Sequence, residues 1–138
     1  DVRHYLTRAR QAALDLKMVE YIAMAKAHAG WLAWRDGALD EAHACCAEAL
    51  ATWHQMPVPY MFDWMALWPL IGVCARREQV AEAIAHARTL FRPEQQPLPA
   101  DLAAATQKAI DAWDQQQPEV AGDHLARAVA LAREGGWL

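Results

Sequence analysis

Histidine and cysteine side chains gather in the stretch that ends at His54, where they could bind a metal ion. His43 and Cys46 are three residues apart, so on a helix both side chains can face the same ion. Cys45 points about 100° away from its neighbour on that helix, and Cys74 is the only other thiol of the chain. A structural zinc site needs four ligands that converge. The sequence therefore favours ordinary helical residues here and predicts no metal ion and no cofactor.

The same residues do not form a catalytic arrangement. The chain has no serine, and a cysteine nucleophile needs a histidine base and a third group that orients the base. Cys45 and His43 point apart on the predicted helix, and a carboxylate pair such as Asp111 and Asp114 falls on a helix surface. The sequence also lacks a glycine-rich phosphate-binding motif. We therefore expect a non-enzymatic domain without catalytic residues.

Aromatic side chains are the most informative excess in the sequence, which contains seven tryptophans in 138 residues. Tyr60, Trp64 and Trp68 follow one another at steps of four and would form a stripe on one helix. One interpretation places these rings in the core, where aromatic rings bury a large area. The other interpretation places them in a groove that binds a partner. The candidate partner-binding residues are Trp34, Arg35, Tyr60, Asp63, Trp64 and Trp68.

Composition indicates that packed helices position these residues. Apolar residues make up 55% of the chain and charged residues 22%, and alanine alone occupies 31 positions. Glycine and proline cluster between segments whose apolar residues recur at steps of three and four. These segments predict an all-α fold of about seven helices. The predicted helices are 2–16, 19–36, 38–55, 60–76, 79–91, 99–115 and 118–134.

Six of the predicted helices pair as hairpins, which span residues 19–55, 60–91 and 99–134. Gly37 can adopt the left-handed conformation that ends the first of these helices. Ala42, Ala83 and Ala121 occupy corresponding places in the three hairpins, 41 and 38 residues apart. Small residues at these places let the two helices of a hairpin approach closely. The sequence therefore predicts a single domain, residues 1–138, built from antiparallel helical hairpin repeats.

The three hairpins resemble the tetratricopeptide repeat, a helix-turn-helix unit of about 34 residues. That family has a small residue in the first helix, which Gly30 matches in the first copy, and an alanine that closes the motif, which Ala49 and Ala128 match. Leu90 replaces the closing alanine in the second copy, and the loops between copies are longer than in the family. The resemblance covers residues 19–134 and implies a TPR-like α-solenoid.

Two stretches are similar to the C-terminal helical repeats of large bacterial signalling and transcriptional-regulator ATPase proteins. These stretches are Phe62–Leu70 and the proline-rich Arg92–Pro99. Those proteins carry a cyclase-like or DNA-binding output domain before an ATPase module and the repeats. The resemblance therefore implies a regulatory module of a bacterial signalling protein. The cysteines form no disulfide framework and indicate a reducing compartment, so we expect the cytoplasm. Because the sequence begins at Asp1 rather than methionine, we expect it to be a piece of such a longer protein.

These observations lead to two hypotheses for function. In the first, the chain binds a protein or peptide segment, or another domain of its parent, on a concave helical face. Trp34 and Trp64 would contact the segment. Polar contacts at the rim of the groove would come from Arg35, Tyr60 and Asp63. In the second, Trp68 joins these two tryptophans to line a closed pocket for a small-molecule effector.

Further expectations concern the kinds of partner. The opening helix would remain from a preceding repeat, so its apolar face would be partly uncovered or would form a homo-oligomer. This face carries Tyr5, Leu6, Ala9 and Ala13. The net charge of -4, without a run of basic residues, predicts no direct binding of nucleic acid. Since no apolar run approaches about 20 residues, the sequence predicts no membrane partner.

Overall fold

The fold consists of helices joined by short turns and by two longer loops. The computed structural model describes residues 2–138, although among the first fourteen residues it describes the side chains of only His4, Arg8, Gln11 and Ala12. Over residues 2–138 the chain forms six helices and no strand, so the predicted all-α class is confirmed. The helices are α1 (Val2–Arg35), α2 (Leu39–His54), α3 (Trp64–Arg76), α4 (Val80–Leu90), α5 (Ala100–Asp114) and α6 (Pro118–Glu134).

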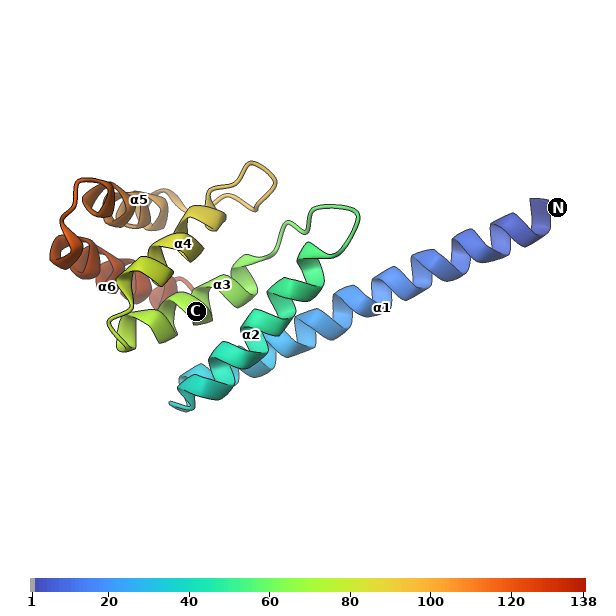
Figure 1. Ribbon diagram of the computed structural model, residues 1–138, viewed down its shortest axis with the longest axis horizontal. Helices are drawn as coiled ribbons and strands as arrows, with labels where there is room; N and C mark the ends of the chain where they lie inside the picture. The colour runs from blue at the N-terminus through green and yellow to red at the C-terminus, as the bar shows by residue number, and fades with distance from the viewer. Residues whose placement is uncertain (1) are drawn as a thin grey trace.

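The prediction of seven helices is wrong because the first two predicted helices are a single one, α1. The junction residues Leu16, Lys17 and Met18 are good helix formers and include no glycine or proline, so nothing ends the helix there. The first half of α1 extends away from the other helices (Figure 1). The predicted apolar face of the opening helix lies outside the side chains that the structure describes; its residues are Tyr5, Leu6, Ala9 and Ala13.

Helix α3 occupies a central place, because it contacts α1, α2, α4 and α6. Consecutive helices pair as the hairpins α1/α2, α3/α4 and α5/α6 (Figure 1). The middle of α3 is enclosed in the core, where Leu67, Trp68 and Ile71 are almost completely buried. The helix continues through Pro69, which is also buried. None of the described helices combines the length and the hydropathy that crossing a membrane requires.

The three hairpin turns share one geometry. At each turn one residue adopts the left-handed conformation, with φ of 82° at Gly37, 56° at Glu78 and 59° at Gln116. The next residue donates its N–H to the carbonyl oxygen five positions earlier, at 2.8, 2.9 and 2.9 Å respectively. This is the Schellman motif, which satisfies carbonyl groups at a helix end. The conformation predicted for Gly37 is confirmed, whereas the two other turns use residues with side chains.

Small residues let the two helices of a hairpin approach closely. Ala42, Ala83 and Ala121, which the sequence places in correspondence, are fully buried. In the first hairpin Gly30 of α1 lies directly against α2. A Cβ atom at Gly30 would lie 2.3 Å from Cys46 Sγ and 3.2 Å from the carbonyl oxygen of Ala42. A side chain at this place would therefore require α1 or the Cys46 side chain to shift.

Gly30→Ala should destabilise the fold. The added methyl group overlaps Cys46 Sγ, and overpacking of this kind costs about 1–3 kcal/mol. Alanine in place of a helical glycine returns only about 0.5–1 kcal/mol. Gly122→Ala is the matched control, because its Cβ would meet Val80 Cγ2 at 3.7 Å, an ordinary contact. Urea unfolding followed by circular dichroism compares the variants, and equal midpoints for both would contradict the close approach of α1 and α2.

Gln116→Gly should stabilise the fold by about 1 kcal/mol, because a side chain in the left-handed conformation costs roughly 1–2 kcal/mol that glycine avoids. Gln115→Gly is the control at the neighbouring position, where φ is -85° and a side chain is unstrained. The free energy of unfolding should rise for the first variant and fall for the second. A decrease for both variants would mean that the turn at Gln116 stores no strain.

Candidate functional site

An apolar groove lies between α1 and α3, where the end of the chain packs against both helices. Its volume is about 480 Å³. Three indole rings contribute to its walls. The complete lining is His28, Trp31, Leu32, Trp64, Met65, Gly136, Trp137 and Leu138. An exposed apolar concavity of this kind is typical of a binding surface.

Trp64 and Trp137 form one wall of the groove and fix each other's orientation. Their ring centroids lie 4.7 Å apart at an interplanar angle of 61°, which is an edge-to-face contact. Trp64 Nε1 donates a hydrogen bond to Gln96 Oε1 at 2.9 Å. Gly136 turns the chain with a φ of 77°, and Trp137 then donates its N–H to the Ala132 carbonyl oxygen at 2.8 Å. This wall is therefore held in place by polar as well as aromatic contacts.

The groove continues into an apolar stripe on the surface of α1. The residues of this α1 stripe are Met18, Ile22, Ala25, Ala29 and Leu32, and all five are exposed. The exposed fractions are 61% for Met18, 58% for Ile22 and 43% for Leu32. The stripe advances by alternating steps of four and three residues, which is the spacing of a coiled-coil seam. Leu32 belongs to both the stripe and the groove.

Of the six candidates from the sequence, Trp64 lines the groove and Arg35 lies beside it. The Arg35 guanidinium is 5.4 Å from the ring centroid of Trp31, which is a groove residue. Trp34 and Trp68 instead belong to the core, with exposed fractions of 4% and 0%. These two rings do not line the groove with Trp64.

Trp34 is enclosed by residues of α3 and α6. A Cβ at Gly72 would lie 2.5 Å from Trp34 Nε1, so the ring rests directly on the α3 backbone. The guanidinium groups of Arg76 and Arg133 lie 4.5 and 5.4 Å from the ring centroid. Arg76 also donates to the Trp34 carbonyl oxygen at 3.2 Å. These contacts give Trp34 a structural role in joining α1 to α3 and α6.

The two remaining candidates, Tyr60 and Asp63, join the long loops at residues 55–63 and 91–99. The helix predicted to begin at Tyr60 begins four residues later. Gln95 explains this, because its Nε2 donates to the Tyr60 carbonyl oxygen at 2.7 Å and its Oε1 accepts the Asp63 N–H at 3.2 Å. The Tyr60 ring stacks on Trp53 with centroids 4.4 Å apart. Both candidates therefore hold the loops together, away from the groove.

Asp63 and His54 form a histidine–aspartate pair beside a cavity of about 370 Å³. Asp63 Oδ2 lies 2.9 Å from His54 Nε2, and only 3% of Asp63 is exposed. Burial raises the pKa of Asp63, and the hydrogen bond from His54 opposes this rise. Catalytic triads contain such a pair together with a nucleophile. The cavity lining includes no serine, threonine or cysteine, and burial raises the pKa of Tyr60 to about 12, so the pair lacks a reactive partner.

The histidine and cysteine residues considered first for metal binding have separate partners. His54 contacts the buried aspartate, whereas His43 Nε2 lies 3.1 Å from Glu82 Oε1. Cys46 Sγ faces the Ala27 carbonyl oxygen at 4.0 Å, and burial raises the pKa of Cys46 to about 12. Within the described residues these side chains do not form a shared group of metal ligands.

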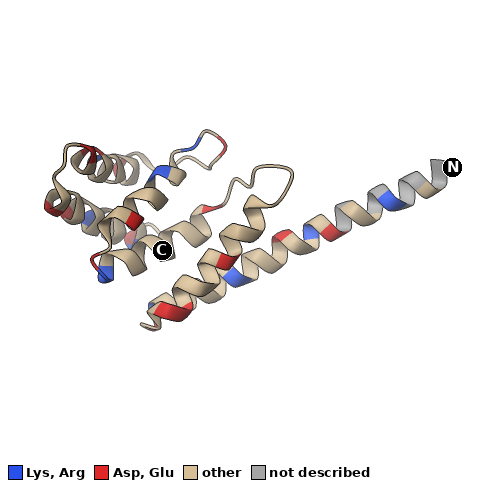
Figure 2. Ribbon diagram, viewed as in Figure 1, with Lys and Arg blue, Asp and Glu red and all other residues tan. Residues whose placement is uncertain are grey.

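Acidic and basic residues are interspersed over the described helices (Figure 2). Ion pairs also join successive hairpins, as between Arg77 and Asp40 and between Arg88 and Asp114.

Comparisons of the chain with protein-family models, with curated proteins and with solved structures find no match. Function is therefore inferred from the groove, the α1 stripe and the side-chain clusters themselves.

Trp31, Leu32 and Trp137 are candidate binding residues that the structure adds to those from the sequence. The spacing of the α1 stripe is the signal that could have identified Leu32, because its steps of four and three leave one face of α1 apolar. Trp137 has no comparable signal, since its place depends on the turn at Gly136 and on contact with Trp64.

Asp63→Asn should stabilise the chain relative to wild type at pH 7 but not at pH 3. The raised pKa of Asp63 means that the folded state binds this proton more tightly than the unfolded state, whose pKa is near 3.8. Wild type therefore loses stability as pH rises from about 4 through the folded pKa, and asparagine removes this loss.

Urea unfolding at the two pH values measures the Asp63 effect. Asp123→Asn, at an exposed carboxylate, controls for the removal of one negative charge. A stability difference between Asp63→Asn and wild type that is the same at pH 3 and pH 7 would contradict a pKa raised by burial.

Proposed function

We propose that this chain is a non-enzymatic interaction module that binds an amphipathic helix of a partner protein. The partner helix would lie along the α1 stripe with one end in the apolar groove. The observation that carries the proposal is the continuity of the two surfaces at Leu32. Together they present a line of exposed apolar side chains that a second helix can cover.

The spacing of the stripe favours a helix over an extended peptide. Met18 and Leu32 lie about 21 Å apart along α1, which corresponds to about four helical turns. The alternating steps of four and three residues along the α1 stripe match the seam along which two helices pack. Ala25 and Ala29, in the middle of the stripe, are small and leave space for large side chains of the partner. An extended peptide that binds by strand addition needs the open edge of a sheet, and the described residues contain no strand.

The groove provides an anchor at one end of the stripe. Binding energy in interfaces concentrates where a large apolar side chain fills a desolvated pocket. The aromatic wall of Trp64 and Trp137 is already fixed by the hydrogen bond to Gln96. Binding to such a preorganised wall costs little side-chain entropy.

The regular hairpins support a repeat scaffold of the tetratricopeptide type. The shared Schellman turns and the buried alanines at corresponding places are the features that a repeated unit would have. The groove takes its helical residues from α1 and α3, the first helices of two successive hairpins, and the rest from the end of the chain. The resemblance at residues 62–70 and 92–99 extends the proposal to a regulatory module of a bacterial signalling or transcriptional regulator, acting in the cytoplasm.

A small-molecule effector is the second candidate ligand. The groove volume of about 480 Å³ falls in the range of about 300–1,000 Å³ that is typical of small-molecule sites. Trp31, Trp64 and Trp137 would offer aromatic faces to such a ligand. The continuity of the groove with the α1 stripe favours the helix.

Leu32→Asp should weaken binding of the partner helix while leaving the chain folded, because Leu32 is 43% exposed where the stripe meets the groove. The probe is a phage-displayed library of helical peptides with apolar residues at i, i+4, i+7 and i+11, selected on the wild-type chain. The affinities of selected peptides, measured by intrinsic tryptophan fluorescence, should fall about tenfold or more in the variant.

Val120→Asp is the matched control, because Val120 is 42% exposed on α6 and does not line the groove. This variant should bind the selected peptides as wild type does. Sedimentation velocity of the wild-type chain tests whether a second copy occupies the stripe instead. Equal binding by both variants would contradict the proposal. A library without enrichment, together with a fluorescence response to small metabolites, would favour the effector.

A further inference from the structure

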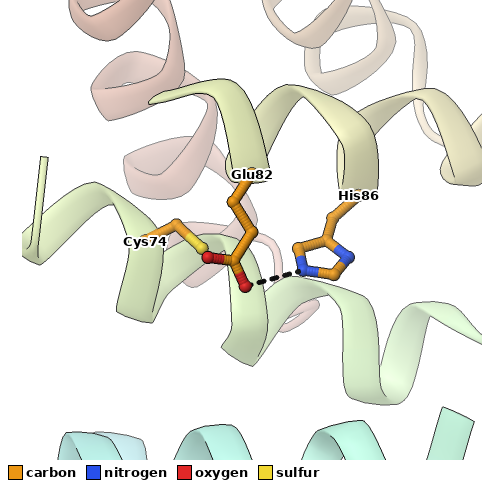
Figure 3. A group of neighbouring side chains, drawn as sticks. All are labelled: Cys74, Glu82 and His86. Atoms are coloured by element: carbon orange, nitrogen blue, oxygen red, sulfur yellow. Dashed lines mark ion pairs between the residues drawn. The ribbon is translucent and has the colours of Figure 1, made fainter. Parts of the chain in front are cut away.

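A second cluster of functional side chains lies between α3 and α4, apart from the groove. Cys74 near the end of α3 points toward Glu82 and His86 of α4 (Figure 3). The ligand atoms of these three residues all lie within 4.8 Å of one another. The spacing of four residues places Glu82 and His86 on the same face of α4. No other three His, Cys, Asp or Glu side chains of the described part of the chain converge in this way.

The separations are close to those around a tetrahedral metal ion. Zinc binds thiolate sulfur at about 2.3 Å and nitrogen or oxygen at about 2.0–2.2 Å, so two ligand atoms of one ion lie about 3.3–3.8 Å apart. His86 Nε2 and Glu82 Oε1 are 3.7 Å apart, which is too long for a hydrogen bond but fits two ligands of one ion. Cys74 Sγ needs to approach the other two atoms by at most about 1.5 Å.

The ring nitrogen of His86 makes no hydrogen bond in the free chain, and its ion-pair partner Glu82 Oε1 lies 3.7 Å away. This nitrogen is buried, and buried polar atoms nearly always have a hydrogen-bond partner. The ring faces the Glu82 carboxylate (Figure 3). A cation between the two groups would bind this nitrogen and the carboxylate oxygen together.

His43 of α2 contacts the same carboxylate from a third helix. Its Nε2 lies 3.1 Å from Glu82 Oε1. The hydrogen bond that His43 donates holds the Glu82 carboxylate in place. Groups that hydrogen-bond a metal ligand in this way orient it and strengthen its binding.

The donor set favours zinc among divalent cations. One thiolate and one carboxylate neutralise the two charges of the ion, and thiolate with imidazole selects zinc over magnesium or calcium. Zinc displaces a thiol proton to solvent as the metal–sulfur bond forms.

We infer that Cys74, Glu82 and His86 bind one zinc ion, with water in the fourth position and His43 orienting Glu82. The side chains of Glu82 and His43 are 41% and 39% exposed, so the ion and the water enter from their side. This site goes beyond the proposed binding of a helix and shares no residue with the groove.

The test is a titration of the chelator-treated full chain with Zn²⁺ and with Co²⁺ as a spectroscopic probe. Wild type should bind one ion per chain, with a near-ultraviolet band from thiolate-to-cobalt charge transfer. Cys74→Ser should lose this band, and His86→Gln should weaken zinc binding by more than about 100-fold. His43→Gln should weaken it by about 10- to 100-fold, as expected for an outer-shell partner.

Cys45→Ser and His124→Gln are the matched controls and should retain the band and the affinity. Circular dichroism verifies that each variant is folded. X-ray absorption at the zinc edge of the loaded wild-type chain needs no variant and should find one sulfur with nitrogen or oxygen ligands. Zinc without a sulfur ligand, or an affinity that Cys74→Ser leaves unchanged, would overturn the assignment. The same conclusion would follow if Mg²⁺ bound as tightly as Zn²⁺.

Discussion

The fold depends on the close approach of helices at positions that lack a bulky side chain. Gly30 admits Cys46 of α2, and Gly72 admits the ring of Trp34, in each case within the space that a Cβ atom would occupy. Because interiors are close-packed, a methyl group at either place forces a helix or a ring to move. The Trp34 ring is buried against α3 because Gly72 leaves such a space. Trp34 has that space, whereas Trp31 remains partly exposed at the groove.

The helices are largely predictable from the sequence because local chemistry decides where they end. The Schellman turn at Gly37 and the helix start at Pro118 both depend on the intrinsic preferences of those residues. The prediction of two helices in place of α1 is wrong for the same reason, because local residue preferences alone decide where a predicted helix ends. Two amphipathic patterns meet at Lys17 without a glycine or proline, and nothing local distinguishes two helices from one. The left-handed turns at Glu78 and Gln116 show the opposite case, since the packing of the hairpins imposes a conformation that these residues rarely adopt.

The functional residues are much less predictable, because contacts between distant segments decide where they lie. Tyr60 shares a helical period with Trp64, yet the side chain of Gln95, over thirty residues away, keeps it outside the helix. Gln95 donates to the Tyr60 carbonyl oxygen and accepts the Asp63 N–H. In the sequence Trp34 cannot be distinguished from a tryptophan that binds a partner, but in the folded chain its ring packs against Gly72. Periodicity identifies which face of a helix is apolar. It does not identify whether that face meets another helix or solvent.

The groove and the proposed zinc site of Cys74, Glu82 and His86 lie at opposite ends of α3. This separation decides how ligands at the two sites affect each other. Trp64 begins α3 and Cys74 lies near its end, about 15 Å further along the helix axis. The proposed partner helix would restrain α3 against α1, whereas the proposed zinc ion would restrain α3 against α4. Effects at sites more than about 7–10 Å apart that share no contact add to each other. The two stabilisations are therefore additive unless α3 moves as one body between its neighbours, because only such a movement would let one ligand change the affinity of the other.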